Sequence, residues 1–342
     1  MNLLHRYFIY VKHYFHIHVS KLGFHQCTLY STKSHQSLYR DTGLSRCRSA
    51  PSLCPLTRLS LFDASLIYPD SASTSQVRKH RMPRFSIITV VYNAADSIAS
   101  TLDSVIAQNV DLEHLIIDGG SSDGTLDILH NYPHQDRLRI VSESDNGIYD
   151  AMNKGLRMAC GQIIGILNAD DFYANDQILC KVHGIFLNSP TDSCYGDLAY
   201  VKKNNVKKIT RYWRAGPFHR SAFYSGWMPP HPTFFVKREV YEKHGGFNLS
   251  LGSAADYELM LRFLVKYGIT TRYIPELMIK MRAGGASNAS IKNRLAANRM
   301  DRKAWRINQL RPLPWTLWAK PARKIKQFFP RSIMHPSGST GR

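Results

Sequence analysis

From Phe85 onward, short apolar runs alternate with amphipathic stretches, a pattern that predicts a parallel β-sheet covered by helices. The apolar runs predicted as buried strands cover residues 85–91, 113–119, 138–143 and 162–169. Helices are predicted near residues 96–107, 123–132 and 147–159. Connections of that length suit right-handed crossovers between parallel strands. The predicted fold class is therefore α/β, with a mostly parallel, Rossmann-like central sheet and helices on both faces.

After Asn188 the pattern changes to scattered strands joined by two amphipathic helices. The strands are predicted at residues 193–201, 207–214, 232–236 and 270–274, and the helices near 237–244 and 255–267. We expect residues 83–285 to form one domain that contains both patterns.

Residues 1–82 differ from the rest, because they are rich in His, Ser, Arg and Tyr, poor in acids and without sustained periodicity. We predict a basic, disordered extension. An alternative is that translation begins at Met82, directly before the first strong strand at Phe85.

Residues 286–342 are predicted to be helical at first and then basic and aromatic. The aromatic residues that interleave with Lys and Arg are Trp305, Trp315, Trp318, Phe328 and Phe329. Such a segment can lie on an anionic bilayer. It can equally close the core and leave a basic face in water, and the sequence leaves both interpretations open.

The composition allows a large core, with 44% hydrophobic residues in 342. The formal net charge of +20 indicates an anionic partner, such as nucleic acid, an acidic membrane or a phosphorylated small molecule. No helix-turn-helix, RNP or zinc-finger pattern occurs in the sequence. It also lacks any apolar run of about 18 residues, the length that a transmembrane helix needs.

Polar residues follow the first, second and fourth predicted strands, where open α/β sheets bind their ligands. Asp118 ends an apolar strand and is predicted to accept hydrogen bonds from a nucleotide base or ribose. Gly119 allows a close approach of the backbone. The plainer alternative is an acid that caps a turn.

Asp170 and Asp171 form an adjacent acidic pair after the fourth strand. Such a pair is tolerated when a hard cation bridges it to diphosphate oxygens, although a solvated loop is an alternative. Asp256 begins an amphipathic helix, where it is either a helix cap or a general base.

Five motifs occur in an order that resembles the family 2 glycosyltransferases with the GT-A fold, over residues 85–282. They are SIITVVYNA, LIIDGGSSDGT, ESDNGIYDAMNKGLRMACG, LNADD, and HPTFFVKREVYEKHGGFN followed by AADYELMLR. Together they are far more specific than any one of them. The resemblance implies an α/β GT-A fold and a metal-dependent, hexosyltransferase-like activity.

For the donor side, the resemblance implies that Asp118 and Gly119 bind the nucleotide base and that Asn93 lies close to it. It makes Asp170 a ligand of Mn²⁺ or Mg²⁺, supported by Asp171. Asn168 stands where many members have the first Asp of the metal motif, which puts a carboxylate contact there in question.

For the acceptor side, the resemblance implies that Asp256 is the catalytic base and that His231 faces the acceptor or the diphosphate. Ala255 replaces the Glu that often precedes this Asp. Arg262, six residues further on, is predicted to brace the helix of Asp256.

The expected function is inverting transfer of one sugar from a nucleotide-sugar donor to the hydroxyl of a saccharide or lipid-linked acceptor. Single transfer is expected because the QxxRW sequence of processive synthases is missing. The expected setting is surface polysaccharide, lipopolysaccharide or glycolipid assembly, in the cytoplasm at the inner face of the membrane. Peripheral contact is expected through the C-terminus, and no nucleic acid partner is expected.

Two competing functions make different demands on the sequence. A catalytically inactive basic scaffold that binds nucleic acid or anionic membrane would need none of the acids. A nucleotidyltransferase would need a glycine-rich, basic triphosphate loop after the first strand, and VVYNAADS lacks one.

Overall fold

The computed structural model describes residues 84–283, 291–325 and 327. The predicted N-terminal extension, residues 1–82, lies outside the described residues, and so does the domain boundary predicted between residues 285 and 286.

The described strands form a single mixed sheet in the order β3-β2-β1-β4-β8-β6-β9-β5, with β7 paired to β6. The strands are β1 (Phe85–Val91), β2 (Leu112–Asp118), β3 (Leu138–Ser142), β4 (Ile163–Asn168), β5 (Asp171–Tyr173), β6 (Ser193–Lys202), β7 (Asn205–Trp213), β8 (Phe235–Lys237) and β9 (Thr271–Arg282). From β3 to β4 all neighbours are parallel, whereas the second half mixes both directions. The predicted α/β class with parallel strands in its first half is confirmed.

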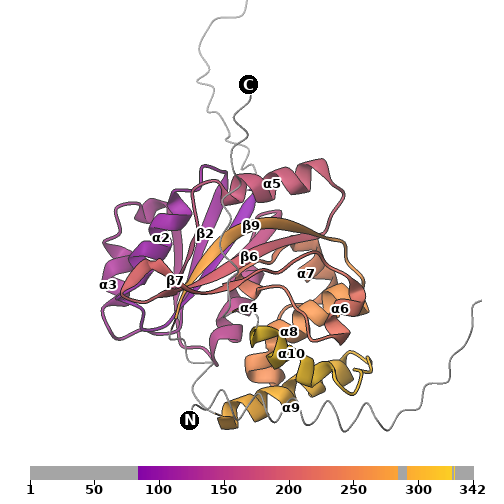
Figure 1. The fold of residues 1–342 in the computed structure, drawn as a ribbon. Helices are drawn as coiled ribbons and strands as arrows, with labels where there is room; N and C mark the ends of the chain where they lie inside the picture. The colour runs from indigo at the N-terminus through magenta and orange to yellow at the C-terminus, as the bar shows by residue number, and fades with distance from the viewer. Residues whose placement is uncertain (1–83, 284–290, 326, 328–342) are drawn as a thin grey trace, which may run out of the picture. The chain divides into compact units, whose positions relative to one another are not determined.

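The helices cover the sheet and connect its strands (Figure 1). They are α2 (Ile98–Ile106), α3 (Thr125–His130), α4 (Ile148–Met158), α5 (Ile178–Asn188), α6 (Arg220–Tyr224), α7 (Arg238–His244), α8 (Ala255–Leu261), α9 (Ile291–Ile307) and α10 (Thr316–Ile325). Short turns η2 (His231–Thr233) and η3 (Leu249–Ala254) lie between them, and a π-helical turn, η4 (Arg262–Lys266), continues α8. The sequence pattern did not predict α5.

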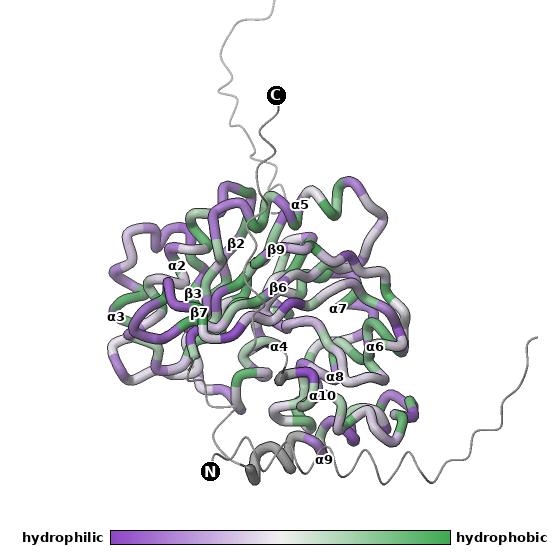
Figure 2. The backbone as a smooth tube through the Cα atoms, in the orientation of Figure 1, coloured by the Kyte–Doolittle hydropathy of each residue, from purple (hydrophilic) through white to green (hydrophobic). Residues whose placement is uncertain are grey.

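Every residue of β1 (FSIITVV) is buried. This is expected for a strand inside a sheet that is covered on both faces. Gly155 allows α4 to pack closely on this strand, since a Cβ there would lie 2.4 Å from the Ile88 side chain. Figure 2 shows hydrophobic residues along the central strands and hydrophilic ones in many surface loops.

Helices α8, α9 and α10 lie together at one side of the sheet (Figure 1). Trp305 of α9 is fully buried, and its Nε1 donates to the Tyr257 hydroxyl of α8 at 2.9 Å. This helix therefore closes part of the core, as one of the two interpretations of the C-terminal segment predicted. Among the residues that the structure describes, no helix combines the length and apolar character needed to cross a membrane.

Candidate active site

The strand register brings the predicted donor-side residues to one edge of the sheet. Asp118 lies opposite Val91, and Asn168 lies opposite Val90, so the two polar residues flank the carboxyl end of β1. Residues more than 40 positions apart in sequence thus meet because parallel strands end together.

Asp118 shapes the turn after β2. Its carboxylate is fully buried and accepts hydrogen bonds from the Gly120 and Ser121 amides, each at 3.1 Å. The hydroxyls of Ser121 and Ser142 donate to it at 2.5 and 2.7 Å. The carboxylate is thus already saturated by the protein, and a direct contact with a nucleotide base stays a prediction.

Asn93 joins the turns after β1 and β2. Its backbone amide donates to the Ser121 hydroxyl at 2.8 Å, and its side-chain Oδ1 accepts from the Ser122 amide at 2.9 Å. The residue has a φ of 47°, a left-handed conformation that Asn tolerates better than most residues. Asn93 therefore holds two loops of the donor side in one arrangement.

Gly119 leaves room for two side chains that sequence reasoning did not select. A Cβ at Gly119 would lie 2.5 Å from Asp145 Oδ2 and 3.5 Å from the Tyr92 ring. Tyr92 is 65% exposed, which is unusual for a large aromatic side chain at the end of a core strand. An exposed ring beside this turn offers a flat apolar face, the surface on which a nucleotide base stacks. An aromatic residue directly after an apolar strand is the sequence signal that could have selected Tyr92.

Asp170 and Asp171 have different surroundings although they are adjacent. Asp171 is fully buried, and its Oδ2 accepts from Asn168 Nδ2 at 3.0 Å. Burial, reinforced by the charge of Asp170, raises the pKa of Asp171 well above its usual value. Asp170 is partly exposed, and burial raises its pKa too, opposed by its own backbone and by the charges of Arg282 and Lys203.

Arg282 holds the turn that carries Asp170, and sequence reasoning missed it. One guanidinium nitrogen donates to the Asp170 carbonyl oxygen at 2.7 Å, and another donates to the Ser100 hydroxyl at 2.7 Å. The guanidinium also lies 4.8 Å from the centroid of the Phe172 ring. It reaches the turn from the far end of β9, so no local motif reveals it.

The donor atoms at this turn fit a hard divalent cation. Asp170 supplies a partly exposed carboxylate, and the side-chain oxygens Asn168 Oδ1 and Asp171 Oδ1 are buried without a hydrogen-bond partner. Within residues 84–283, 291–325 and 327, no group of three or more His, Cys, Asp or Glu side chains is placed to hold a metal. Mg²⁺ is usually bound by one or two carboxylates together with substrate phosphates and water.

Asp256 lies in the first turn of α8 and is partly exposed. Tyr149 of α4 is its hydrogen-bonded neighbour: burial raises the pKa of Tyr149 above its usual range, and the charge and hydrogen bond of Asp256 raise it further. His231 of η2 is close as well. Burial lowers the pKa of His231, and the charge of Asp256 opposes that change. The structure thus brings the predicted pair Asp256 and His231 together and adds Tyr149.

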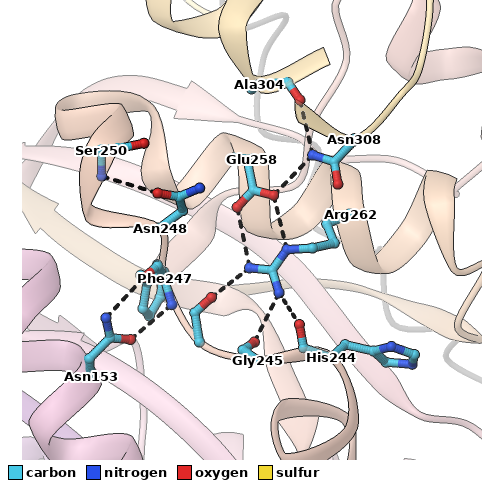
Figure 3. Close-up of polar contacts among 11 residues, drawn as sticks. Asn153, His244, Gly245, Phe247, Asn248, Ser250, Glu258, Arg262, Ala304 and Asn308 are labelled. Carbon is cyan, nitrogen blue, oxygen red and sulfur yellow. Dashed lines mark hydrogen bonds and ion pairs between the residues drawn. The ribbon is translucent and has the colours of Figure 1, made fainter. Parts of the chain in front are cut away.

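Phe247 packs beneath this cluster. Its ring centroid lies 5.4 Å from that of Tyr149 and 5.6 Å from that of His231. The backbone of Phe247 is fixed by Asn153 of α4, which donates to its carbonyl at 2.9 Å and accepts from its amide at 2.8 Å (Figure 3). Neither residue was selected from the sequence.

Arg262 braces the helix of Asp256, as the sequence predicted. Its guanidinium pairs with the buried carboxylate of Glu258 at 2.9 Å and donates to the carbonyl oxygens of His244, Gly245 and Gly246 (Figure 3). Asn308, directly after α9, donates to the same Glu258 carboxylate at 2.9 Å. One buried ion pair therefore joins α8 to the loop before Phe247 and to α9.

Tyr200 of β6 lies across β9 from Asp171 in the acidic turn after β4. Tyr200 and Asp171 both pair with Met281, one on each side of β9. Burial raises the pKa of Tyr200, and the negative charges of Asp171 and Asp256 raise it further. The guanidinium of Arg211, 4.4 Å from the centroid of the Tyr200 ring, lowers this pKa. The charges of Asp171 and Asp256 thus both act on the pKa of this one side chain.

A mixed α/β sheet whose parallel strands end in a tied polar turn and an acidic turn, with a separate carboxylate at the start of α8, is the arrangement of an α/β transferase of the GT-A type. The family model described as glycosyl transferase family 2 matches residues 86–245. A PGL/p-HBAD biosynthesis glycosyltransferase of Mycobacterium tuberculosis is 31% identical over 214 residues, which are 61% of this chain and 81% of that protein. The chain therefore belongs to glycosyl transferase family 2, and nucleotide-sugar glycosyl transfer is its reaction class.

Two further comparisons agree with this assignment. The chondroitin synthase of Pasteurella multocida is 32% identical over 190 residues, which are 54% of this chain and 19% of that protein. The crystal structure of S. aureus TarS 1-349 in complex with UDP superposes with a TM-score of 0.53 at 17% identity, covering 72% of this chain and 73% of that one. The second comparison supports the fold alone.

Proposed function

We propose that the protein transfers a single sugar, with inversion, from a nucleotide-sugar donor to an acceptor hydroxyl, with help from a divalent metal. The observation that carries the proposal is the turn after β4, where Asp170 offers a partly exposed carboxylate and the buried oxygens Asn168 Oδ1 and Asp171 Oδ1 have no hydrogen-bond partner. We assign the donor diphosphate to this turn and the acceptor hydroxyl to Asp256, whose charge acts together with that of Asp171 on the pKa of Tyr200.

In the proposed reaction Asp256 accepts the proton of the acceptor hydroxyl. The acceptor oxygen then forms a bond to the anomeric carbon of the donor sugar, and the bond to the nucleoside diphosphate breaks with its electron pair on the diphosphate. Attack from the side opposite the leaving group inverts the anomeric centre. Tyr149 holds the Asp256 carboxylate in place through their hydrogen bond.

Asp170, with the oxygens of Asn168 and Asp171 behind it, would hold Mn²⁺ or Mg²⁺ against the donor diphosphate. When bound, the cation neutralises the negative charge that develops on the leaving group. Arg282 keeps the Asp170 turn in position through the carbonyl at 2.7 Å. We propose that Asn93, Asp118 and Gly119 shape the turn that binds the nucleotide base. Tyr92 stacks on that base.

The acceptor is proposed to be a saccharide or a lipid-linked sugar in surface polysaccharide or glycolipid assembly. The relative that is 31% identical is described as a PGL/p-HBAD biosynthesis glycosyltransferase, which supports a role in glycoconjugate assembly. We propose a cytoplasmic location at the inner face of the membrane. His231 faces the acceptor in this proposal, and no nucleic acid takes part.

A donor screen by calorimetry tests the proposal. UDP-, GDP- and dTDP-sugars are titrated into the protein with and without Mn²⁺ or Mg²⁺. We expect one nucleotide class to bind, with an affinity that depends on the metal and is lost in Asp170→Ala. The matched control is Asp176→Ala, which removes an exposed acid shortly after the same turn and should bind the donor as the unmodified protein does.

Two outcomes would contradict the proposal. If no donor binds to the folded protein, the chain acts as a basic scaffold instead of an enzyme. If a donor binds equally well without metal and in Asp170→Ala, the metal assignment is wrong, and the positive charges of Arg282 and Lys203 are the better candidates for holding the diphosphate.

A further inference from the structure

Exposed large hydrophobic side chains are concentrated in one short part of the described chain. Ile307, Leu313, Trp315 and Trp318 lie within residues 307–318, with Trp315 56% and Trp318 68% exposed. The other exposed large hydrophobic side chains are single residues on separate elements: Tyr92, Ile148, Leu187, Leu249 and Tyr267. Scattered exposure is ordinary, whereas two neighbouring exposed indoles indicate a contact surface.

The exposed rings lie on one side of a helical turn. The amides of Trp318 and Ala319 donate to the Trp315 carbonyl at 3.0 and 2.8 Å, so residues 315 and 318 are one turn apart and Ala322 follows on the same side. Leu313, Trp315, Trp318 and Ala322, all exposed, are called the α10 surface below. The opposite side of this helix faces the protein, because Thr316 and Leu317 are buried.

The α10 surface is held firmly on the domain. Lys320 pairs with the buried carboxylate of Asp301 at 2.8 Å, and the Thr316 hydroxyl donates to the Tyr224 carbonyl at 2.6 Å. A Cβ at Gly226 would lie 2.3 Å from the Lys320 amide nitrogen, so the loop that follows α6 packs directly against the backbone of α10. The indoles therefore project from a fixed helix.

The charge around the α10 surface has one sign. Asp301 is the only acid in residues 291–342, and it is buried and paired with Lys320. Exposed arginines remain on the same two helices and their connection, namely Arg299, Arg302, Arg306, Arg311 and Arg323. An occupant of this surface has to accept indole rings and carry negative charge.

We propose that the α10 surface docks on an anionic lipid bilayer. Indole rings favour the boundary between headgroups and acyl chains, while arginines beside them interact with lipid phosphates. This inference rests on the membrane location proposed above and names the surface that makes the contact. Its test measures binding to vesicles and is independent of turnover. A lipid-linked acceptor would then approach the domain from the side on which α8 carries Asp256, since α8, α9 and α10 pack together.

Co-sedimentation with lipid vesicles tests this proposal on the full chain. We expect binding to vesicles that contain phosphatidylglycerol, weak binding to phosphatidylcholine alone, and a loss of binding as salt is raised. The double variant Trp315→Ala with Trp318→Ala should bind about tenfold more weakly, because two large apolar side chains no longer leave water. Leu187→Ala, at a residue that is 67% exposed on α5, is the matched control and should not change binding.

A second pair of variants separates a local charge effect from a general one. Arg306→Gln with Arg311→Gln removes two charges beside the α10 surface, and Lys207→Gln with Lys208→Gln removes two exposed charges from β7. Only the arginine variant should weaken vesicle binding. Circular dichroism checks that all variants remain folded, which we expect because the replaced side chains are exposed.

Three results would overturn the proposal. The tryptophan variant could bind vesicles as the unmodified protein does. The lysine variant could weaken binding as much as the arginine variant, which would make the attraction a property of the whole basic chain. Sedimentation could also reveal a dimer that only the tryptophan variant dissociates, without vesicle binding, which would assign the α10 surface to a second copy of the chain.

Discussion

The donor side and the acceptor side of the site are built by different means. On the donor side, most hydrogen bonds to the Asp118 carboxylate come from its own turn, from residues two and three positions further along the chain. On the acceptor side, Asn153 and Phe247 are 94 positions apart, and Glu258 and Asn308 are 50 apart. The Asp118 turn therefore follows from where parallel strands end, whereas the acceptor side, like the contact of Arg282 with the Asp170 turn, depends on polar contacts between distant segments.

This difference has a functional consequence. A substitution at a remote position such as Asn308 can move Asp256 without touching either substrate, because Glu258 and Arg262 transmit the change along α8. The turn that Asp118 shapes has few such connections. We therefore expect substitutions in the long-range contacts to affect the acceptor side more than nucleotide binding, and the following variants test this difference.

Asp256→Asn should have the largest effect. It removes the proposed proton acceptor but keeps the size of the side chain, so we expect kcat to fall by about 10³-fold or more, within the range of general base catalysis. Donor affinity should stay within about twofold, because the nucleotide turn is on the other side of the site. Steady-state kinetics and calorimetry measure the two quantities. Unchanged turnover would remove Asp256 from the catalytic role.

Glu258→Ala should have the next largest effect, on stability. It leaves the Arg262 guanidinium without its buried carboxylate partner, and we expect the free energy of unfolding to fall by about 3 kcal/mol. The matched control is Glu242→Ala, which breaks the more exposed ion pair with Arg238, also four residues apart, and should cost less than about 0.5 kcal/mol. Urea denaturation measures both variants.

Equal destabilisation in these two variants would mean that the buried ion pair contributes no more than a surface pair. The long-range network of the acceptor side would then not be what holds α8. If Glu258→Ala is destabilised as expected and still binds the donor when folded, donor binding does not depend on the ion pair that holds α8.

The sequence predicted the donor side more completely than the acceptor side, for a physical reason. Strand ends can be located from apolar runs, and parallel strands end at one edge, so Asn93, Asp118 and Asp170 could be selected without coordinates. Tyr149, Phe247 and Arg282 could not be, because each acts through a partner that only the folded chain brings near. Asp256 was selected from its place at the start of an amphipathic helix, where a helix cap was the alternative; the resemblance then implied the catalytic base, and this role stays a prediction.

The Asp171 surroundings show a second limit of sequence reasoning. Adjacent acids suggested two similar metal ligands, yet one carboxylate is fully buried and the other is partly exposed. The alternation of side-chain direction at the start of β5 separates them. A pattern can thus locate an acidic turn, but which carboxylate faces a ligand depends on the path of the backbone.

Acidification should destabilise the donor side through His114, the third expected effect. This side chain of β2 is fully buried, and its Nε2 contacts the hydroxyl of Thr89 in β1 at 2.8 Å. Burial lowers the pKa of His114 from 6.5 to about 3. Below pH 6.5 the unfolded chain binds a proton that the folded chain excludes, so the free energy of unfolding decreases as pH falls towards about 3.

The expected loss through His114 is about 2 kcal/mol at pH 5 relative to neutral pH. Urea denaturation at several pH values measures it. In His114→Gln this part of the pH dependence should disappear, whereas His134→Gln, at an exposed position, should keep it. An identical pH dependence in the His114 variant would show that the ring is protonated in the folded protein.

Tyr149→Phe should have the smallest effect and gives the sharpest test of the acceptor side. It removes only the hydroxyl that is bonded to Asp256 and keeps the ring that packs on Phe247. We expect kcat to fall by about tenfold, close to the contribution of one hydrogen bond, while donor affinity and the free energy of unfolding hardly change. Tyr267→Phe, on an exposed ring, is the control and should leave kcat unaltered. If Tyr149→Phe instead lowers stability and leaves kcat unchanged, Tyr149 only packs the acceptor side, and Asp256 is positioned by the Glu258–Arg262 pair alone.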